Sequence, residues 1–264
     1  MTLPDDFADA LAAAKPRLGL LASSVTYFPT IGSTNDVAAS MSEGAVVIAG
    51  AQTAGRGRRG QTWFSPSGAG LYVSIALTPS RSVDARRATA LTTIAAGVAL
   101  AEGIEAATGV RVRLKWPNDV YVARRKLAGI LAEASAAGDR VNAIVLGYGI
   151  NIAEASYPVE LRDRVTSLES ELGAAPPRAR VLAETLAAMA ARYDDLLAGR
   201  FDAILNGWRN RADAAGARVE WAAADGLRSG VVVDIADDGA LLVQIGSDVQ
   251  RIVSGEVTFH AVSH

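Results

Sequence analysis

The chain has 264 residues, half of them apolar, with a formal net charge of −2 and a pI near 5.8. It can bury one large core, or a large and a small one, and its charge disfavours bulk attraction to nucleic acid. The absence of cysteine excludes disulfides, cysteine zinc sites and a cysteine nucleophile. Its two histidines, His260 and His264, stand at the C-terminal end, which disfavours a serine–histidine–aspartate triad.

No targeting or membrane segment is expected. The opening residues Met1–Asp6 are acidic where a signal peptide would need a basic stretch. No uninterrupted apolar run reaches the roughly 18 residues that a membrane-spanning helix needs. A cytoplasmic location is therefore the expectation.

Apolar spacing divides most of the chain into helices and short strands. In chain order, it predicts a helix over 8–22, strands over 25–28, 45–51 and 71–77, a helix over 84–107, and strands over 120–123, 128–134 and 141–149. Residues 32–36 combine turn and N-cap types, so a further helix is expected to start there. The three strands from 120 to 149 follow one another across tight turns, one of them at 137–139, which predicts antiparallel hairpins and not a doubly wound parallel sheet.

The second half changes character twice. Residues 153–177 contain several prolines and charges with little periodicity, which predicts a mobile loop. Helices are expected over 178–197 and 201–212. From about residue 215 the chain turns into short β segments, predicted over 218–221, 229–235, 240–245 and 249–253, with a hairpin turn at Asp237–Gly239. We therefore expect two domains, 1–213 and 214–264, the second a small β-barrel.

The strongest chemical signal is a loop rich in arginine and glycine, Gly55–Gly60. Its glycines fit the dinucleotide-binding pattern, but the following Trp63–Gly68 contains Pro66 and cannot open the helix that this pattern requires. Guanidinium groups bind phosphate and carboxylate in pairs of hydrogen bonds, and glycines let the backbone approach a ligand closely. The loop therefore predicts a ligand that carries both groups.

Lysine is rare in this chain. Of the 26 basic residues only Lys15, Lys115 and Lys126 are lysines. Lysine places a compact charge on a slim stem and can contact a single oxygen closely, which arginine cannot do. Lys115 begins the run Lys115–Asp119, where Pro117 fixes the backbone beside a polar turn and Asp119 offers a carboxylate suited to magnesium. Trp116 in this run could equally be a core residue.

A third element, Gly147–Asn151, ends an apolar run with two glycines and an amide. Such a strand end suits a flat base that packs against backbone and bonds Asn151 at its edge. By itself this element is a weak signal.

In combination, these motifs closely resemble the catalytic domain of biotin–protein ligases. The resemblance rests on Ser33–Asn35, the Gly55–Gly60 loop, Lys115–Asp119, Lys126–Leu131 and Gly147–Asn151, in this order and at these distances. Matching motifs extend the resemblance over about residues 25–152. The β-rich tail resembles the family only in the arrangement of its predicted strands. Gln61 departs from the pattern, since many members carry a basic residue there.

The resemblance implies an α+β catalytic domain with a mixed, largely antiparallel sheet and flanking helices, related to class II synthetases, followed by a C-terminal SH3-like β-barrel. It implies a short ligase without the DNA-binding domain of some members, since few residues precede Val25. The implied substrates are biotin and ATP with Mg²⁺, and the implied partner is a biotin carboxyl carrier domain. A homodimer is expected, with no binding to DNA or membrane.

The resemblance also assigns roles to residues. The implied catalytic residues are Lys126, Arg56 and Arg58. The implied biotin-binding residues are Ser33, Thr34, Asn35, Gln52, Arg56, Gly57, Arg58, Lys126, Gly129 and Leu131. The implied ATP-binding residues are Arg56, Arg58, Trp63, Lys115, Asn118 and Asn151, with Asp119 as the magnesium ligand.

Two alternatives from other classes stay open. A lipoate–protein ligase would share the architecture and the adenylate chemistry, but lipoate has no ureido ring for Ser33, Asn35 and Gln52 to bond. A protein that only senses a biotin-like ligand would keep the pocket without needing Lys126.

Overall fold

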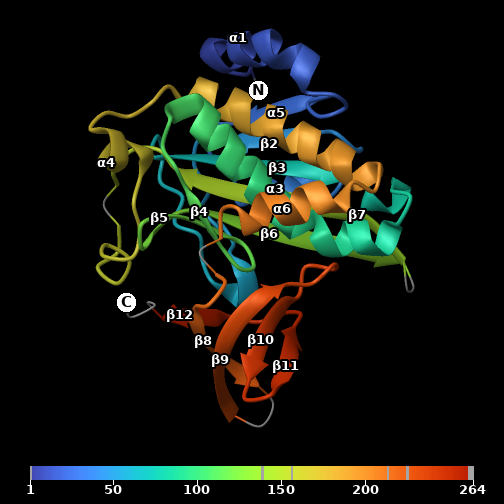
Figure 1. Cartoon of the computed structure of the whole chain (residues 1–264). Coiled ribbons are helices and arrows are strands. Elements are labelled where there is room, and N and C mark those ends of the chain that lie inside the picture. Colours follow the sequence, from blue (N-terminus) through green and yellow to red (C-terminus); the bar gives the residue numbers. More distant parts are fainter. Residues whose placement is uncertain (1, 138–139, 156, 213, 224–225, 261–264) are drawn as a thin grey trace.

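A computed structural model describes residues 2–137, 140–155, 157–212, 214–223 and 226–260. These residues form a seven-stranded sheet with helices packed on it and a separate five-stranded sheet at the C-terminal end (Figure 1). The predicted α+β class and the expected small β domain are therefore confirmed. The predicted turn at 137–139 lies partly outside the described residues. So does residue 213, next to the domain boundary, which stays a prediction.

The larger sheet has the strand order β1-β2-β3-β7-β6-β5-β4. Only β1 and β2 pair in parallel, and every other neighbouring pair is antiparallel, as expected for the hairpins. The strands are β1 (Val25–Phe28), β2 (Val46–Ala49), β3 (Gly70–Leu77), β4 (Arg113–Lys115), β5 (Asp119–Val122), β6 (Arg125–Ala137) and β7 (Arg140–Asn151). The short edge strand β4 was not predicted, because it holds too few residues to show periodicity.

The helices are α1 (Asp5–Ala14), α2 (Thr34–Ala38), α3 (Ala85–Thr108), α4 (Leu168–Leu172), α5 (Arg178–Leu197) and α6 (Phe201–Arg209). The helix predicted over 8–22 is wrong at both ends, since α1 starts earlier and gives way to a 3₁₀ turn at Lys15–Arg17. The loop predicted over 153–177 contains α4. This short helix starts where the Ser167 hydroxyl accepts the Ser170 N–H, and it ends at the left-handed Gly173.

Helix α3 crosses the sheet as the central core helix. Asp84 caps its start by accepting the Arg87 N–H, and the left-handed Gly109 ends it. By length and hydropathy alone α3 could span a membrane, but 72% of its most apolar window is buried inside the protein. Its small residues let α5 and α6 pack closely, and all three lie on the same face of the sheet (Figure 1).

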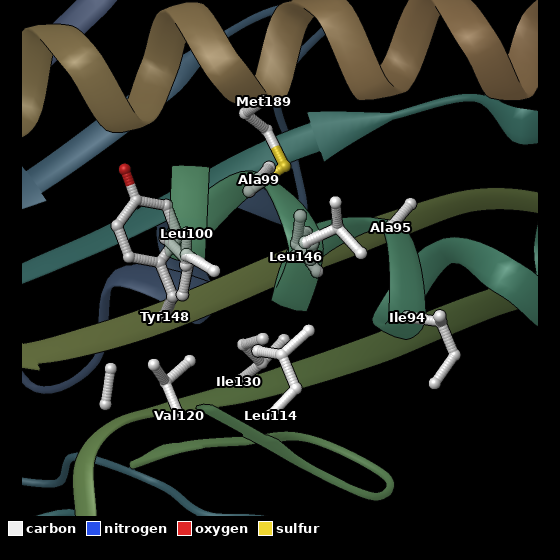
Figure 2. Close-up of a cluster of buried hydrophobic side chains, with 14 of the residues drawn as sticks. Ile94, Ala95, Ala99, Leu100, Leu114, Val120, Ile130, Leu146, Tyr148 and Met189 are labelled. Carbon is white, nitrogen blue, oxygen red and sulfur yellow. The ribbon is translucent and has the colours of Figure 1, made fainter. Parts of the chain in front are cut away.

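The two faces of the larger sheet serve different purposes, because neighbouring strand residues point to opposite sides. On β7, Leu146 and Tyr148 face the helices, where they pack among Ala99, Leu100 and Met189 (Figure 2). On β2, Val47 belongs to a second, small cluster beneath α2, while its neighbours join the main core. Helix α2 therefore covers the opposite face, and the glycines of β7 fall on that side.

The C-terminal sheet has the order β11-β10-β9-β8-β12, with every neighbouring pair antiparallel. Its strands are β8 (Arg218–Ala223), β9 (Gly226–Ile235), β10 (Leu241–Ile245), β11 (Asp248–Ile252) and β12 (Val257–His260). The predicted hairpin turn at Asp237–Gly239 joins β9 to β10. Strand β12 was not predicted, although it pairs with β8 and lies beside the site.

Candidate active site

A cleft of about 610 Å³ opens on the α2 side of the larger sheet. Every residue that the sequence analysis selected for the site lines this cleft. They are Ser33, Thr34, Asn35, Gln52, Arg56, Gly57, Arg58, Trp63, Lys115, Asn118, Asp119, Lys126, Gly129, Leu131 and Asn151. Segments far apart in sequence thus meet here, because α2, the arginine loop and the ends of β4 to β7 lie on one side of the sheet.

The start of α2 forms a buried polar end of the cleft. Ser33, Thr34 and Asn35 are all buried. The N–H and hydroxyl of Thr34 both donate to Gln52 Oε1, at 2.9 and 3.1 Å, and Gln52 Nε2 donates to Ser65 Oγ at 3.1 Å. Gln52 therefore holds Thr34 in place and has a fixed amide orientation.

Ser74 of β3 lies beneath this polar end and was missed by the sequence analysis. Its hydroxyl is fully buried, 2.7 Å from Thr34 Oγ1 and 2.5 Å from Asn35 Oδ1. A hydroxyl carries one proton, so it can donate to only one of these two oxygens at a time. The available signal was a lone polar residue in an otherwise apolar strand.

The arginine loop closes on itself. Gly57 N–H donates to the Gln61 carbonyl at 2.7 Å, and Trp63 N–H donates to the Gly55 carbonyl at 2.9 Å. Within the loop Arg59 takes the left-handed conformation, with φ of 55°. A side chain at Gly55 would collide with the backbone of Trp63, so this position requires glycine.

Arg58 points into the cleft. Its Nη1 donates to Asn118 Oδ1 at 3.2 Å, and it forms no ion pair with any residue that the structure describes. Burial lowers the pKa of Arg58, and the charge of Asp119 opposes this shift. An arginine whose charge is half-buried and not matched by a carboxylate in contact is suited to binding an anion.

Lys126 lines the cleft beside Asp119 and Trp63. Its Nζ lies 2.6 Å from Asp119 Oδ1 and 5.3 Å from the centre of the Trp63 ring. The indole of Trp63 packs over Gly129 and Gly149, where a side chain would displace it. Its Nε1 is buried and has no hydrogen-bond partner among the described residues. Buried polar groups are rarely left unpaired, so this N–H is a candidate ligand contact.

Lys115 lies near two aromatic rings, one from each sheet. Its Nζ is 5.5 Å from the centre of the Tyr121 ring and 5.8 Å from that of Phe259 on β12. Burial lowers the pKa of Lys115, with the charge of Asp119 acting against that shift. Burial likewise raises the pKa of Tyr121 to about 12.

The segment before α4 forms one wall of the cleft. Lys126 N–H donates to the Arg164 carbonyl at 2.8 Å, and Thr166 N–H donates to the Lys126 carbonyl at 3.0 Å. Asn151 Nδ2 donates to the Thr166 carbonyl at 3.0 Å. Wall residues that the sequence analysis missed are Tyr157, Leu161, Arg164 and Val165.

The C-terminal sheet completes the cleft. Gly255, Glu256 and Val257, just before and at the start of β12, line it. The indole Nε1 of the buried Trp116 donates to the Gly239 carbonyl at 2.9 Å, so the β9–β10 turn rests against the Lys115–Asp119 run. Trp116 is therefore a core residue as well as a neighbour of the site.

The described residues contain no group of three or more histidine, aspartate or glutamate side chains placed to hold a metal ion. The carboxylates that line the cleft are Asp119 and Glu256, and Asp119 is the ion-pair partner of Lys126. Magnesium is commonly bound by one or two carboxylates together with substrate phosphates. Asp119 therefore suits a magnesium ion only if the phosphates of a nucleotide supply most of its ligands.

Comparisons with known proteins agree with this arrangement. Residues 27–151 match the biotin/lipoate A/B protein ligase family, and residues 225–259 match the biotin protein ligase C-terminal domain. The chain is 34% identical over 258 residues to the bifunctional ligase/repressor BirA of Bacillus spizizenii, which covers 94% of this chain and 78% of that relative. It is 34% identical over 231 residues to a biotin–[acetyl-CoA-carboxylase] ligase of Paracoccus denitrificans, and this match covers 84% of this chain and 93% of that relative.

Among solved structures, the fold is similar to that of the biotin protein ligase from Aquifex aeolicus in complex with biotin and ATP. The TM-score is 0.79 at 27% identity, and the match covers 91% of this chain and 100% of that chain.

Proposed function

This chain belongs to the biotin protein ligases of the biotin/lipoate A/B protein ligase family, and we propose that it uses ATP to activate biotin and then attaches it to a protein lysine. One observation carries the proposal. The cleft has a neutral hydrogen-bonding end at Thr34 and Asn35 and a cationic end at Arg58 and Lys126. Biotin has matching ends, an uncharged ureido ring and a carboxylate.

In the first half-reaction a carboxylate oxygen of biotin attacks the α-phosphorus of ATP. The bond from this phosphorus to the bridging oxygen breaks, and pyrophosphate leaves. Two anions must meet, so cations aimed at both lower their repulsion and stabilise charge in the transition state. Arg58 and Lys126 both line the cleft and would supply these two cations.

In the second half-reaction the nitrogen of an acceptor lysine attacks the carbonyl carbon of the mixed anhydride. The bond to the AMP oxygen breaks, and the amine gives up a proton. The arginine loop and Trp63 line the cleft, and with ligand bound they would help to keep water from the adenylate.

Several finer points remain predictions. Magnesium would reach the site with ATP and neutralise phosphate charge, and Asp119 is the carboxylate beside Lys126 that could contact it. The acceptor would be a biotin carboxyl carrier domain. A cytoplasmic location and a homodimer are likewise expected, and sedimentation with and without biotin would test the latter.

The deciding experiment is pyrophosphate exchange with ATP and magnesium, in response to biotin or to lipoate. We expect exchange with biotin and hardly any with lipoate, because the ring of lipoate has no ureido group to hydrogen-bond with the buried polar side chains near Thr34. Equal exchange with lipoate would contradict the biotin assignment. Calorimetric biotin binding without any exchange would favour the non-catalytic sensor.

A further inference from the structure

Two carboxylates outside the motifs hold Arg56 of the arginine loop. Arg56 Nη1 lies 2.7 Å from Asp36 Oδ1, and Arg56 Nη2 lies 3.0 Å from Glu133 Oε2. Asp36 belongs to α2 and Glu133 to β6, so the loop is tied to the helix and to the sheet. The hydrogen bonds that Arg56 donates to these two carboxylates also raise the pKa of Arg56, the bond to Glu133 contributing more than the bond to Asp36.

Glu133 has a second role at the polar end of the cleft. The same oxygen, Oε2, accepts a hydrogen bond from Asn35 Nδ2 at 2.5 Å. This bond fixes which way the Asn35 amide faces, so that Asn35 Oδ1 is turned toward Ser74. Glu133 thus connects the arginine loop to the polar end of the cleft through one atom, whereas Asp36 contacts only Arg56 among these side chains.

The two arginines of the loop are therefore not equivalent. Arg56 already has two carboxylates in contact, and its charge is matched within the protein. Arg58 forms no ion pair with any described residue and points at Asn118 inside the cleft. A ligand anion would have to compete with two carboxylates for Arg56 and with none in contact for Arg58.

We propose that Glu133 and Asp36 are positioning residues, which fix the Gly55–Gly60 loop through Arg56 and leave Arg58 to bind the anionic ligand. This inference deepens the proposed function and rests on it for the ligand. Glu133 additionally sets the orientation of Asn35. Loss of Asp36 should therefore affect the loop alone, and loss of Glu133 should affect both the loop and the polar end.

The tether itself can be tested without any ligand. Arg56, Arg58 and Arg59 are trypsin sites inside the loop, so the rate of loop cleavage, followed by intact mass, reports how often the loop leaves the protein surface. We expect Asp36→Asn and Glu133→Gln each to raise this rate about two- to fivefold, the size expected for an exposed ion pair. Glu184→Gln is the matched control, because it removes a comparable pair with Arg17 at 2.7 Å, remote from the cleft.

Salt provides a second readout that a general loss of stability would not reproduce. The three side chains are 38% (Arg56), 62% (Asp36) and 42% (Glu133) exposed, so dissolved ions screen their attraction. Loop cleavage in the unsubstituted protein should become faster as salt is raised. In Arg56→Gln cleavage at the remaining arginines should be fast already and depend little on salt.

A second set of experiments uses the ligand and measures the rate of biotinyl-adenylate dissociation and the KM for biotin. Asp36→Asn should speed dissociation and leave the KM for biotin unchanged, while Glu133→Ala should change both. Adding Asp36→Asn to Arg56→Gln should have no further effect, because the two residues act as a pair. Melting curves of every variant establish that it is folded.

Each outcome has one meaning. Suppose that the unsubstituted protein exchanges pyrophosphate in response to biotin. The proposed tether of Arg56 would then be wrong if Asp36→Asn and Glu133→Gln were folded and showed unchanged loop cleavage and unchanged adenylate release. If the parent shows no exchange with biotin, the proposed function fails, and the cleavage experiment still decides whether Arg56 is tethered.

Discussion

Lys126 Nζ lies 2.6 Å from Asp119 Oδ1, and this ion pair depends on an irregularity between β5 and β6. The pairing register shifts between Val120 and Tyr121, so that Asp119 pairs with Gly129 and Tyr121 pairs with Lys126. Such bulges re-aim side chains beside functional sites. Here the two charged groups meet over the cleft, next to Trp63.

The first prediction concerns Lys126, whose ammonium can contact a carboxylate oxygen and a phosphate oxygen together. Removing one preorganised donor of this kind typically lowers the rate about 10²- to 10³-fold. Lys126→Gln should lose adenylate formation to this extent and still bind biotin within about tenfold, because the contact strengthens in the transition state. Single-turnover adenylation and calorimetric biotin affinity measure the two quantities.

Two comparison variants sharpen this test. Lys126→Arg should not restore the rate, because the broad guanidinium does not fit a one-oxygen contact beside Asp119. Lys15→Gln, at an exposed position remote from the cleft, should leave both quantities unchanged. Near-normal adenylation by Lys126→Gln would mean that Lys126 serves only to pair with Asp119.

A second prediction concerns Arg58, the loop arginine without a carboxylate in contact. Arg58→Gly should hold biotinyl-adenylate less tightly, and its dissociation rate should rise about 10- to 100-fold, the effect of losing one charged hydrogen bond. Arg59→Gly is the comparison, since the Arg59 side chain is exposed and its φ of 55° suits glycine. An unchanged dissociation rate in Arg58→Gly would show that Arg58 does not clamp the ligand.

Local patterns in the sequence accounted for much of this fold. The helix Arg178–Leu197 was predicted with its observed bounds, and the strands around Leu71 and Gly147 lie within a residue or two of theirs. Amphipathic spacing and turn residues are local properties, so one sequence displays them. The motif residues also meet in one cleft, because the elements that carry them present them on one side of the larger sheet.

Contacts between distant residues could not be predicted in this way. In the sequence, Glu133 is a single glutamate in an apolar run, and nothing local distinguishes it. Only folding brings it to Asn35 and Arg56, which are 98 and 77 positions away. Glu256 and its neighbours enter the cleft because the β9–β10 turn docks on Trp116. No periodicity records such a contact, and the three-residue strand β4 is too short to show any.

A third prediction concerns the pH dependence of ATP binding through Lys115. Burial lowers the pKa of Lys115, so this group loses its proton at a lower pH than the usual 10.5. The protonated form of Lys115 attracts phosphate, so the affinity for ATP should fall as the pH rises through the lowered pKa of Lys115. Loss of one charged hydrogen bond would lower that affinity by up to about 10- to 100-fold. Tyr121, with a pKa of about 12, does not titrate in this range.

The control for this prediction is Lys115→Arg, which keeps its charge throughout the range. Its KM for ATP should stay flat where that of the parent rises, whatever its value at neutral pH. Parallel alkaline profiles for both proteins would assign the titration to another group.

The last prediction concerns Phe259, through which the C-terminal sheet reaches Lys115. The centre of its ring lies 5.8 Å from Lys115 Nζ, and the centre of the Tyr121 ring lies 5.5 Å from the same atom. A cation over an aromatic ring is stabilised by about 0.5–2 kcal/mol, more when water is excluded. Phe259→Ala should therefore raise the KM for ATP about 2- to 30-fold. Biotin affinity should not change, because Thr34 and Asn35 lie at the other end of the cleft.

Phe259→Leu keeps an apolar side chain without the ring and should resemble Phe259→Ala, whereas Phe259→Tyr should resemble the parent. If Phe259→Leu retained the parental KM for ATP, Phe259 would act by filling space and not through the charge of Lys115.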